Sequence, residues 1–205
     1  MVFCEKRLIE ADSAAACEVV YLVIKEMGVK ITPQIARSIY TGIATDTGCF
    51  RFSNTTADTH IAAAVLVSYR INHAAINRRM FEIKSKERIA LESYLATNIE
   101  YECDDKIAIV PITFGVQKKF NMKDEDFDGL SSIALQAESV EVGITIKQKT
   151  EDRYKISFRS SNNVDVSKIC AVFGGGGHVK AGGCTLVGTY DEVREKLVSA
   201  AKEAL

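Results

Sequence analysis

A run of four glycines followed by a histidine is the strongest candidate for chemistry in this sequence. It reads Gly174-Gly175-Gly176-Gly177-His178. Glycine reaches positive φ, and its missing Cβ lets a ligand approach the main-chain N–H groups. Consecutive N–H groups that point into one concavity bind anions, and the His178 imidazole can donate to a phosphate. The alternative is a flexible loop with a surface histidine, but the apolar segments on both sides of the run favour close packing.

Arg159 is the second candidate, at the end of an alternating segment that includes Ile156-Ser157-Phe158-Arg159-Ser160. A guanidinium can hold a phosphate through two parallel donors, which a lysine cannot do. The alternative is an ordinary surface arginine. One short predicted helix separates Arg159 from the glycine run, so the two can face one pocket.

Asp46 is the third candidate, within Thr45-Asp46-Thr47-Gly48. A carboxylate is a good ligand for hard divalent cations. One aspartate does not make a metal site, however, and an aspartate that caps a turn is the common alternative.

The elements that would position these residues change in type along the chain. The first half predicts helices: one capped by Ser13 and ended by Gly28, one that starts at Thr32-Pro33, and one that starts near residues 56–59. Asn72 is expected to cap a long helix that runs to Ala96. Strand-like sequence in this half is limited to about residues 6–9.

The second half predicts a mixture of strands and helices. The expected strands are 106–113, a hairpin of 140–147 with 153–159, and 184–187; the expected helices are 124–138, 164–173 and 189–205. The change of period between residues 96 and 104 predicts a domain boundary, which gives domains 1–98 and 99–205.

Composition and charge limit the classes of function. Lys and Arg number 26 against 27 Asp and Glu, so the net charge of −1 provides no broad positive field for long duplex nucleic acid. The six cysteines contain no C-x-x-C pair, which favours reduced thiols. The start has no signal-peptide pattern, and the longest apolar runs are too short to span a bilayer. We therefore expect a cytoplasmic protein without a membrane segment.

The order and spacing of these motifs resemble the DHH phosphoesterase family, in its RecJ-like branch of oligoribonucleases and pAp phosphatases. The segment 45–50 resembles the last metal-binding motif of that family. Arg159-Ser160 and Gly174–His178 with Ala181 resemble the substrate-binding elements of its DHH-associated C-terminal domain. Residues 11–21 resemble the helix between the third and fourth family motifs.

The resemblance implies an α/β fold, in which a truncated parallel-sheet DHH domain is joined by a long helix to a smaller mixed-sheet domain. It implies two Mn²⁺ or Mg²⁺ ions that activate a water for attack on a phosphodiester. Asp46 would be a metal ligand. The residues implied in binding the substrate phosphate are Arg159, Ser160, Gly175, Gly176, Gly177 and His178. The implied ligands are short single-stranded RNA or DNA or nucleotide phosphates, and the family often forms homodimers.

The sequence departs from the family at the metal motifs. It contains neither an Asp-His-His triplet nor the upstream Asp-x-Asp motif, and its three histidines are far apart. Gly182 stands where the family usually has a second alanine. Two functions therefore stay open: a phosphodiesterase whose remaining metal ligands lie in an upstream segment, and a nucleotide-binding module without chemistry. In both cases we expect this chain to be inactive alone.

Overall fold

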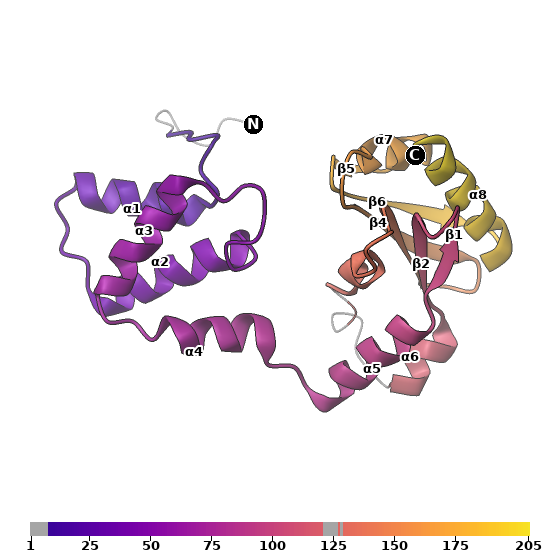
Figure 1. The fold of residues 1–205 in the computed structure, drawn as a ribbon, viewed down its shortest axis with the longest axis horizontal. Helices are drawn as coiled ribbons and strands as arrows, with labels where there is room; N and C mark the ends of the chain where they lie inside the picture. Colours follow the sequence, from indigo (N-terminus) through magenta and orange to yellow (C-terminus); the bar gives the residue numbers. More distant parts are fainter. Residues whose placement is uncertain (1–7, 121–126, 128) are drawn as a thin grey trace. The chain divides into compact units, whose positions relative to one another are not determined.

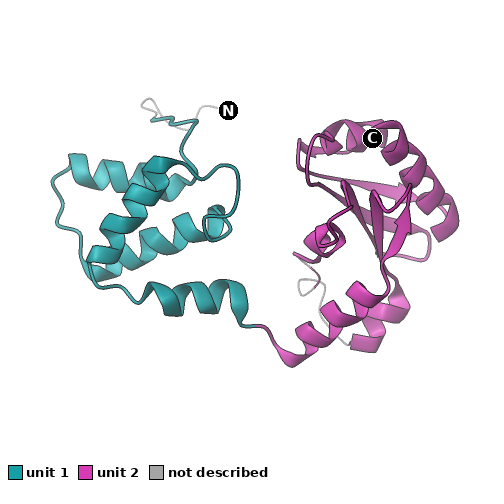
Figure 2. Ribbon diagram, viewed as in Figure 1, with its two compact units in different colours: residues 1–83 teal, residues 84–205 magenta. Residues whose placement is uncertain are grey.

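The computed structural model describes residues 8–120, 127 and 129–205. The chain divides into two compact units, Met1–Ile83 and Lys84–Leu205, each with its own hydrophobic core (Figure 2). We call them unit 1 and unit 2.

All regular secondary structure in the described part of unit 1 is helical (Figure 1). Its helices are α1 (Ala16–Glu26), α2 (Pro33–Asp46), α3 (Ala57–Ser68) and α4 (His73–Asn77), and a π-helical turn η1 (Arg78–Glu82) follows α4 directly. Leu8 and Ile9, the described part of the expected N-terminal strand, adopt no regular structure. Residues 6 and 7 lie outside the described part of the chain.

Side-chain caps define the starts of α2 and α3, and of α4 as described below. The Thr32 hydroxyl accepts from the Ile35 N–H, and Pro33 occupies the first turn of α2. Thr56 and Thr59 form a reciprocal capping box at α3. The expected Ser13 cap is wrong: α1 begins after Ala15, which makes no side-chain cap.

The core of unit 1 is built around α2. Ala36, Ile39, Tyr40, Ile43 and Ala44 are buried at helical spacing, and they pack with buried residues of α1 and α3. Ile39 and Ile43 are buried on this face, whereas Ile35, one turn earlier, is only half-buried.

The expected continuous helix 72–96 is wrong, although Asn72 does cap α4 as predicted. The helical path ends at η1, and Ile83 is extended, with φ −75° and ψ 122°. The Ser85 hydroxyl then accepts from the Arg88 N–H and starts a new helix, α5 (Lys86–Thr97). The break falls between units 1 and 2, so α5 belongs to unit 2.

Unit 2 contains a six-stranded mixed sheet, which confirms the expected fold class. The strands are β1 (Glu100–Glu102), β2 (Ile107–Ile112), β3 (Val142–Gln148), β4 (Arg153–Ser160), β5 (Gly176–His178) and β6 (Ala181–Val187). Their order is β1-β2-β3-β4-β6-β5, and only the β2–β3 pair is parallel (Figure 1).

The helical elements of unit 2 after α5 are α6 (Phe114–Phe120), η3 (Leu130–Leu135), α7 (Val166–Val172) and α8 (Tyr190–Glu203). The expected α-helix 124–138 is wrong in its described part, because Gly129 has a left-handed φ of 75° and a short 3₁₀ helix, η3, follows. Residues 124–126 and 128 lie outside the described residues.

The sheet has one apolar face and one divided face. Alternate residues of β2, β3 and β4, such as Ile109, Ile144 and Phe158, pack under α7 and α8. On the opposite face, Ala108, Val110 and Ile112 of β2 join a second core with α5, α6 and η3. Across β3, β4, β6 and β5 that same face carries polar residues and glycines, and we call this part the polar face. Its residues are Thr145, Lys147, Lys155, Ser157, Arg159, Ala181, Gly183, Thr185, Gly176 and His178.

Within the described residues, no helix combines the length and apolar character that crossing a bilayer requires.

Candidate functional site

Strand register brings two of the sequence candidates onto the polar face. Arg159 of β4 pairs with Ala181 of β6, and Ala181 pairs with His178 of β5. Partners in one cross-strand row point to the same side of a sheet, so Arg159 and His178 share a face two strands apart, about 10 Å. The pairing of β4 with β6 therefore joins features that are 19 residues apart in the sequence.

Arg159 is half-buried, and the structure shows no carboxylate partner for it among the described residues. Its Nη1 donates to the Phe158 carbonyl oxygen at 2.9 Å. Burial lowers the pKa of the Arg159 guanidinium, which nevertheless stays protonated at neutral pH. A partly desolvated cation without a counter-charge is a favourable partner for an anion.

The glycine run is packed into the fold, as the apolar segments on both sides of it predicted. The Gly174 N–H donates to the Ala171 carbonyl, and the Gly175 N–H donates to the Cys170 carbonyl, so both amides are occupied by the end of α7. Gly176–His178 then form strand β5 at the sheet edge. The expected nest of consecutive free N–H groups is therefore wrong for Gly174 and Gly175.

The structure surrounds each of the four glycines differently. Gly174 has φ +71°, and an added Cβ at Gly175 or Gly177 would lie 2.3 or 2.4 Å from a backbone carbonyl oxygen. Gly176 meets no atom within 4 Å. It belongs to the row of Ser157 and faces the polar side. Backbone conformation and packing thus account for three of the glycines, and the side of Gly176 is open.

Two neighbouring hollows border the polar face, and the first also touches Ile156, Phe173 and Cys184, which belong to the core on the opposite side of the sheet. The first, about 470 Å³, is lined by the glycine run and we call it the glycine hollow; its residues are Lys155, Ile156, Ser157, Phe173, Gly174, Gly175, Gly183, Cys184 and Thr185. The second, about 280 Å³, we call the lysine cavity; its residues are Ile112, Phe127, Gly129, Ser131, Thr145, Lys147, Lys155, Ser157 and Arg159. Lys155 and Ser157 line both. Arg159 and the glycine run therefore border adjoining hollows rather than a single pocket.

Four residues of this face were missed by the sequence interpretation: Thr145, Lys147, Lys155 and Ser157. A signal was present for two of them, because Lys155 and Ser157 have the same strand parity as Arg159. Thr145 and Lys147 come from the partner strand, and only the register between β3 and β4 places them beside the others.

Ser160 points away from this face. It is buried, and its hydroxyl donates to the Val164 carbonyl at 2.6 Å, while Lys180 Nζ donates to the same hydroxyl at 3.4 Å. Adjacent residues of a strand face opposite sides of a sheet. The expected grouping of Ser160 with Arg159 as a ligand contact is not reproduced by this geometry.

Asp46 is the last residue of α2 and is exposed. The turn after it is strained, because Cys49 and Phe50 are non-glycine residues with φ of 60° and 64°. Asn54 ties this turn down by donating to the Asp46 carbonyl at 3.2 Å. Strained backbone beside a carboxylate is typical of a functional position.

The metal site that the resemblance implies is not complete in the described residues. They contain no group of three His, Cys, Asp or Glu side chains placed to hold a metal ion. Asp46 belongs to unit 1, whereas Arg159, His178 and the glycine run belong to unit 2. The carboxylate can contribute one oxygen donor, but the residues present do not fit a two-metal centre.

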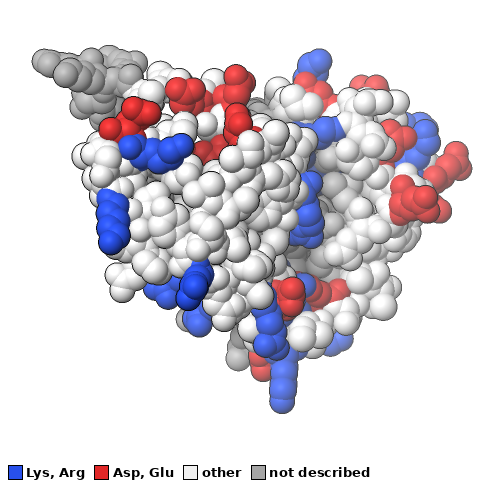
Figure 3. Space-filling model, turned by 60° about the vertical axis from the view of Figure 1, so that its left-hand side comes forward, with Lys and Arg blue, Asp and Glu red and all other residues white. Residues whose placement is uncertain are grey.

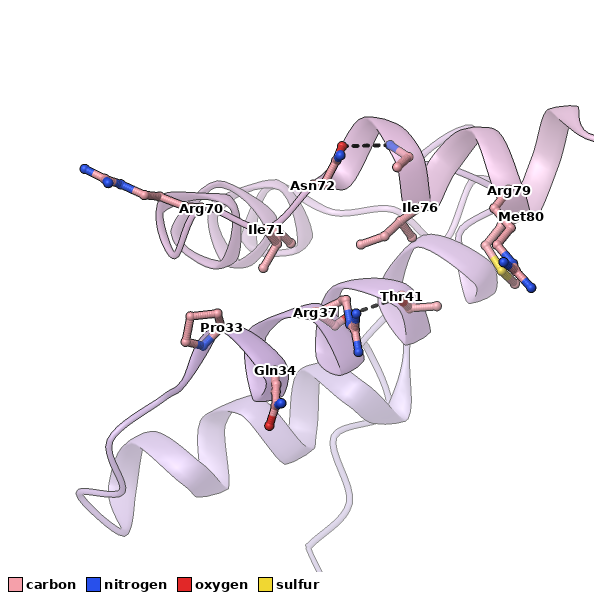
Figure 4. A pocket seen from close by; sticks show the side chains of 11 residues that line it. Pro33, Gln34, Arg37, Thr41, Arg70, Ile71, Asn72, Ile76, Arg79 and Met80 are labelled. Atoms are coloured by element: carbon pink, nitrogen blue, oxygen red, sulfur yellow. Dashed lines mark hydrogen bonds between the residues drawn. The ribbon is translucent and has the colours of Figure 1, made fainter.

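A cavity of about 480 Å³ also lies in unit 1, between α2 and the segment 70–80. Figure 4 shows Arg37, Arg70 and Arg79 around it, with Arg70 directed away from the other two. Ile71, Ile76 and other apolar groups line the space between them. These arginines do not converge on one point, so the cavity lacks the geometry of a phosphate grip.

The surface charge is mixed. On the face shown in Figure 3, Lys and Arg are scattered among Asp, Glu and large uncharged areas. The charges on the face shown agree with the net charge of −1 and do not form the broad basic surface of a duplex-binding protein.

Comparisons with known proteins identify relatives of both units. Residues 104–205 match the DHHA1 domain. The bifunctional oligoribonuclease and PAP phosphatase NrnA of Thermus thermophilus is 30% identical over 201 residues, which cover 97% of this chain and 59% of that protein. The crystal structure of an exopolyphosphatase-related protein from Bacteroides fragilis superposes with a TM-score of 0.90 at 28% identity. The superposition covers 98% of this chain and 60% of the Bacteroides protein.

A more distant structure shares only the fold. The pGpG-specific phosphodiesterase PggH of Vibrio cholerae has a TM-score of 0.57 at 12% identity, over 100% of this chain and 78% of its own. The chain spans about 60% of the length of the Thermus and Bacteroides proteins.

Proposed function

Because the chain belongs to the DHH phosphoesterase family and carries its DHHA1 domain, we propose that unit 2 binds the phosphate of a short oligonucleotide or nucleotide in a phosphoesterase. The observation that carries the proposal is the row that joins Arg159 to His178 on the polar face, beside the glycine hollow.

The proposed contacts follow from the geometry of that row. Arg159 offers a half-buried fork of donors without a described counter-ion, and His178 is an exposed imidazole on the same face. Gly176 and Gly177 allow the substrate to approach edge strand β5 closely, and Gly175 holds β5 against β6. Ser160 acts indirectly, because its hydroxyl is bonded to the segment that leads into α7.

In this proposal the DHHA1 domain extends over residues 99–205, and residues 1–98 belong with the catalytic DHH domain. Asp46 would be one ligand of the Mn²⁺ or Mg²⁺ ions, which supply an activated water when bound. The relatives named as oligoribonuclease and PAP phosphatase support short RNA and nucleotide phosphates as the substrate class. The described cysteines are free thiols, which suits the reducing cytoplasm.

A second function is favoured by the incomplete metal site. With no three-ligand group among the described residues, the chain by itself would be a nucleotide-binding module without hydrolysis. Both functions share the phosphate grip of unit 2, and they differ only in whether metal chemistry is added to it.

An NMR titration of the 205-residue chain with AMP tests the shared grip. We expect the amides of residues 175–178 to shift, with a Kd on the order of tens of µM to mM, because a few charge-assisted hydrogen bonds must outweigh the cost of association. Binding should weaken with added salt.

Arg159→Lys should weaken binding markedly, since lysine loses the two-donor fork. Arg153→Lys is the matched control: it lies on the same strand, about 20 Å from Arg159, and lines neither hollow. Saturating AMP that moves none of the glycine amides would show that the run is only a structural turn.

A further inference from the structure

The cavity between α2 and the segment 70–80 of unit 1 has a basic rim. Its volume is about 480 Å³, and its described lining includes Arg37, Arg70 and Arg79 but no aspartate or glutamate. None of the three guanidinium groups forms an ion pair with a described residue. Arginine stays protonated at neutral pH. The described lining of the cavity is therefore positively charged.

The three arginines are spread along the cavity. In Figure 4, Arg70 lies at one end, Arg79 lies at the other, and Arg37 lies between them. Arg70 follows α3 with a left-handed φ of 58°, and Arg79 belongs to η1. Donors that converge on one point suit a single phosphate, whereas donors along a groove suit the repeated phosphates of a nucleic-acid strand. This arrangement favours a strand over a mononucleotide.

Aliphatic side chains form the floor between the arginines. Ile71 is buried, Ile76 is half-buried, and Met80 is 47% exposed. Figure 4 shows Ile71 and Ile76 directed into the space between the segment 70–80 and α2. The flat face of a nucleobase can cover such a floor and remove its apolar surface from water, and a guanidinium plane can stack on the same base.

Polar groups beside the floor can pair with the edge of a base. The Asn72 Oδ1 accepts from the Ala75 N–H at 3.0 Å, which leaves the two Nδ2 donors of Asn72 available. The Gln34 side chain forms no hydrogen bond with a described residue, and it offers both a donor and an acceptor. Exposed bases of single-stranded RNA are bound through such donors and acceptors.

We infer that this cavity of unit 1 is a contact site for a single-stranded oligonucleotide, in which Arg37 and Arg79 bind phosphates of the strand while a base packs on the aliphatic floor. The inference rests on the proposed function, because it takes the ligand of the chain to be an oligonucleotide. It adds a contact that a mononucleotide lacks, so binding to this chain should depend on strand length.

Fluorescence anisotropy with a labelled RNA pentaadenylate, together with NMR titrations with the same RNA and with AMP, tests the contact in the 205-residue chain. We expect the pentaadenylate to bind about tenfold more tightly than AMP and to shift the amides of Ile71 and Ile76. Arg37→Gln combined with Arg79→Gln should remove this advantage and leave AMP binding within about twofold. Each lost phosphate contact should also lower the slope of log affinity against log salt by about 0.7.

Arg78→Gln is the matched control, because Arg78 is an exposed arginine next to Arg79 on η1 and does not line the cavity. It should leave RNA binding unchanged, whereas Arg79→Gln alone should weaken RNA binding severalfold. Amide spectra of each variant establish that unit 1 stays folded. Equal losses in Arg78→Gln and Arg79→Gln would overturn the inference, since they indicate general attraction between the RNA and a basic surface.

Further outcomes separate this inference from its alternatives. Equal affinity of the wild-type chain for the pentaadenylate and AMP would overturn the strand contact and leave the proposed function standing. If an acidic peptide of Glu and Leu shifts the amides of Ile71 and Ile76 while the RNA does not, the cavity is a peptide-docking site and the inference is wrong. If AMP moves none of the amides of residues 175–178, the proposed function fails, whereas RNA shifts confined to the cavity would still support the strand contact.

Discussion

In unit 2, one face of one sheet carries a half-buried arginine, an exposed histidine, two lysines and a glycine-containing edge strand, whereas the family-like motif of unit 1 contributes one exposed carboxylate, Asp46, before a strained turn. A phosphate grip can be built from neighbouring strands, because alternate residues of each strand face the same side. A two-metal centre needs several ligands that converge from different elements. The difference indicates that phosphate binding and metal chemistry are separable properties of this chain.

The two units also differ in how their apolar residues are covered. The apolar face of the sheet is closed by α7 and α8. In unit 1, Val20 and Val23 of α1 and Ile61 and Val65 of α3 are exposed. Glu18, in the first turn of α1, is buried with its Oε1 unpartnered among the described residues. Unit 2 exposes apolar residues too, such as Val172 and Val179, but these lie outside its cores.

The largest expected effect is the absence of hydrolysis. The purified chain with Mn²⁺ should not cleave short RNA or pAp above background, because Asp46 cannot fix two cations alone. A discontinuous assay of product formation measures this, and addition of an upstream segment with the missing motifs should restore turnover. Robust turnover by the 205-residue chain, lost in Asp46→Ala, would contradict the inference that phosphate binding and metal chemistry are separable properties of this chain.

The next effect concerns the independence of unit 2. Phe158 is fully buried in its core, so Phe158→Ala should lower the free energy of unfolding of unit 2 by about 3–5 kcal/mol. Hydrogen exchange resolved by residue would show faster exchange in β3 and β4 and unchanged exchange in α2. Phe114→Ala is the control, since Phe114 is 45% exposed. Equal loss of protection in both units would show that they unfold as one.

The smallest expected effect concerns the ion pairs of Glu92 with Lys84 and Arg88, at the start of unit 2. Burial raises the pKa of Glu92. The hydrogen bonds from Arg88 and Lys84, together with their positive charges, lower it by more, so the pKa of Glu92 lies below its usual range. Glu92→Gln should cost less than about 1 kcal/mol, because these pairs are partly exposed.

The pH dependence of that cost follows from the direction of the shift. A lowered pKa in the folded state stabilises above the unfolded pKa, and the contribution is lost as pH falls through the folded value. Urea unfolding from neutral to acidic pH should show the wild-type advantage over Glu92→Gln shrinking in acid. Glu195→Gln, on exposed α8 surface, is the control. A difference that stays constant with pH would rule out the ion pairs as its source.

Local sequence patterns were sufficient to predict much of the fold. Alternation in 140–147 and 153–159 predicted the β3–β4 hairpin, and Thr32-Pro33 predicted the start of α2. These features are set by strand parity and by caps, which depend on residues close in the sequence. The end of the long helix was missed because its helical pattern continues past Ile83, whereas the Ser85 cap breaks it.

The sequence by itself determined that Arg159 and the glycine run could bind an anion, because those residue types carry that chemistry anywhere. Only the tertiary structure decided that β6 lies between β4 and β5, which puts His178 in the row of Arg159 and turns Ser160 to the other side. It also placed Lys147 opposite Lys155 and left the Thr145 hydroxyl unpartnered among the described residues. Strand order and register are non-local, since they arise from how α7, α8 and η3 cover the sheet, and no short segment encodes them.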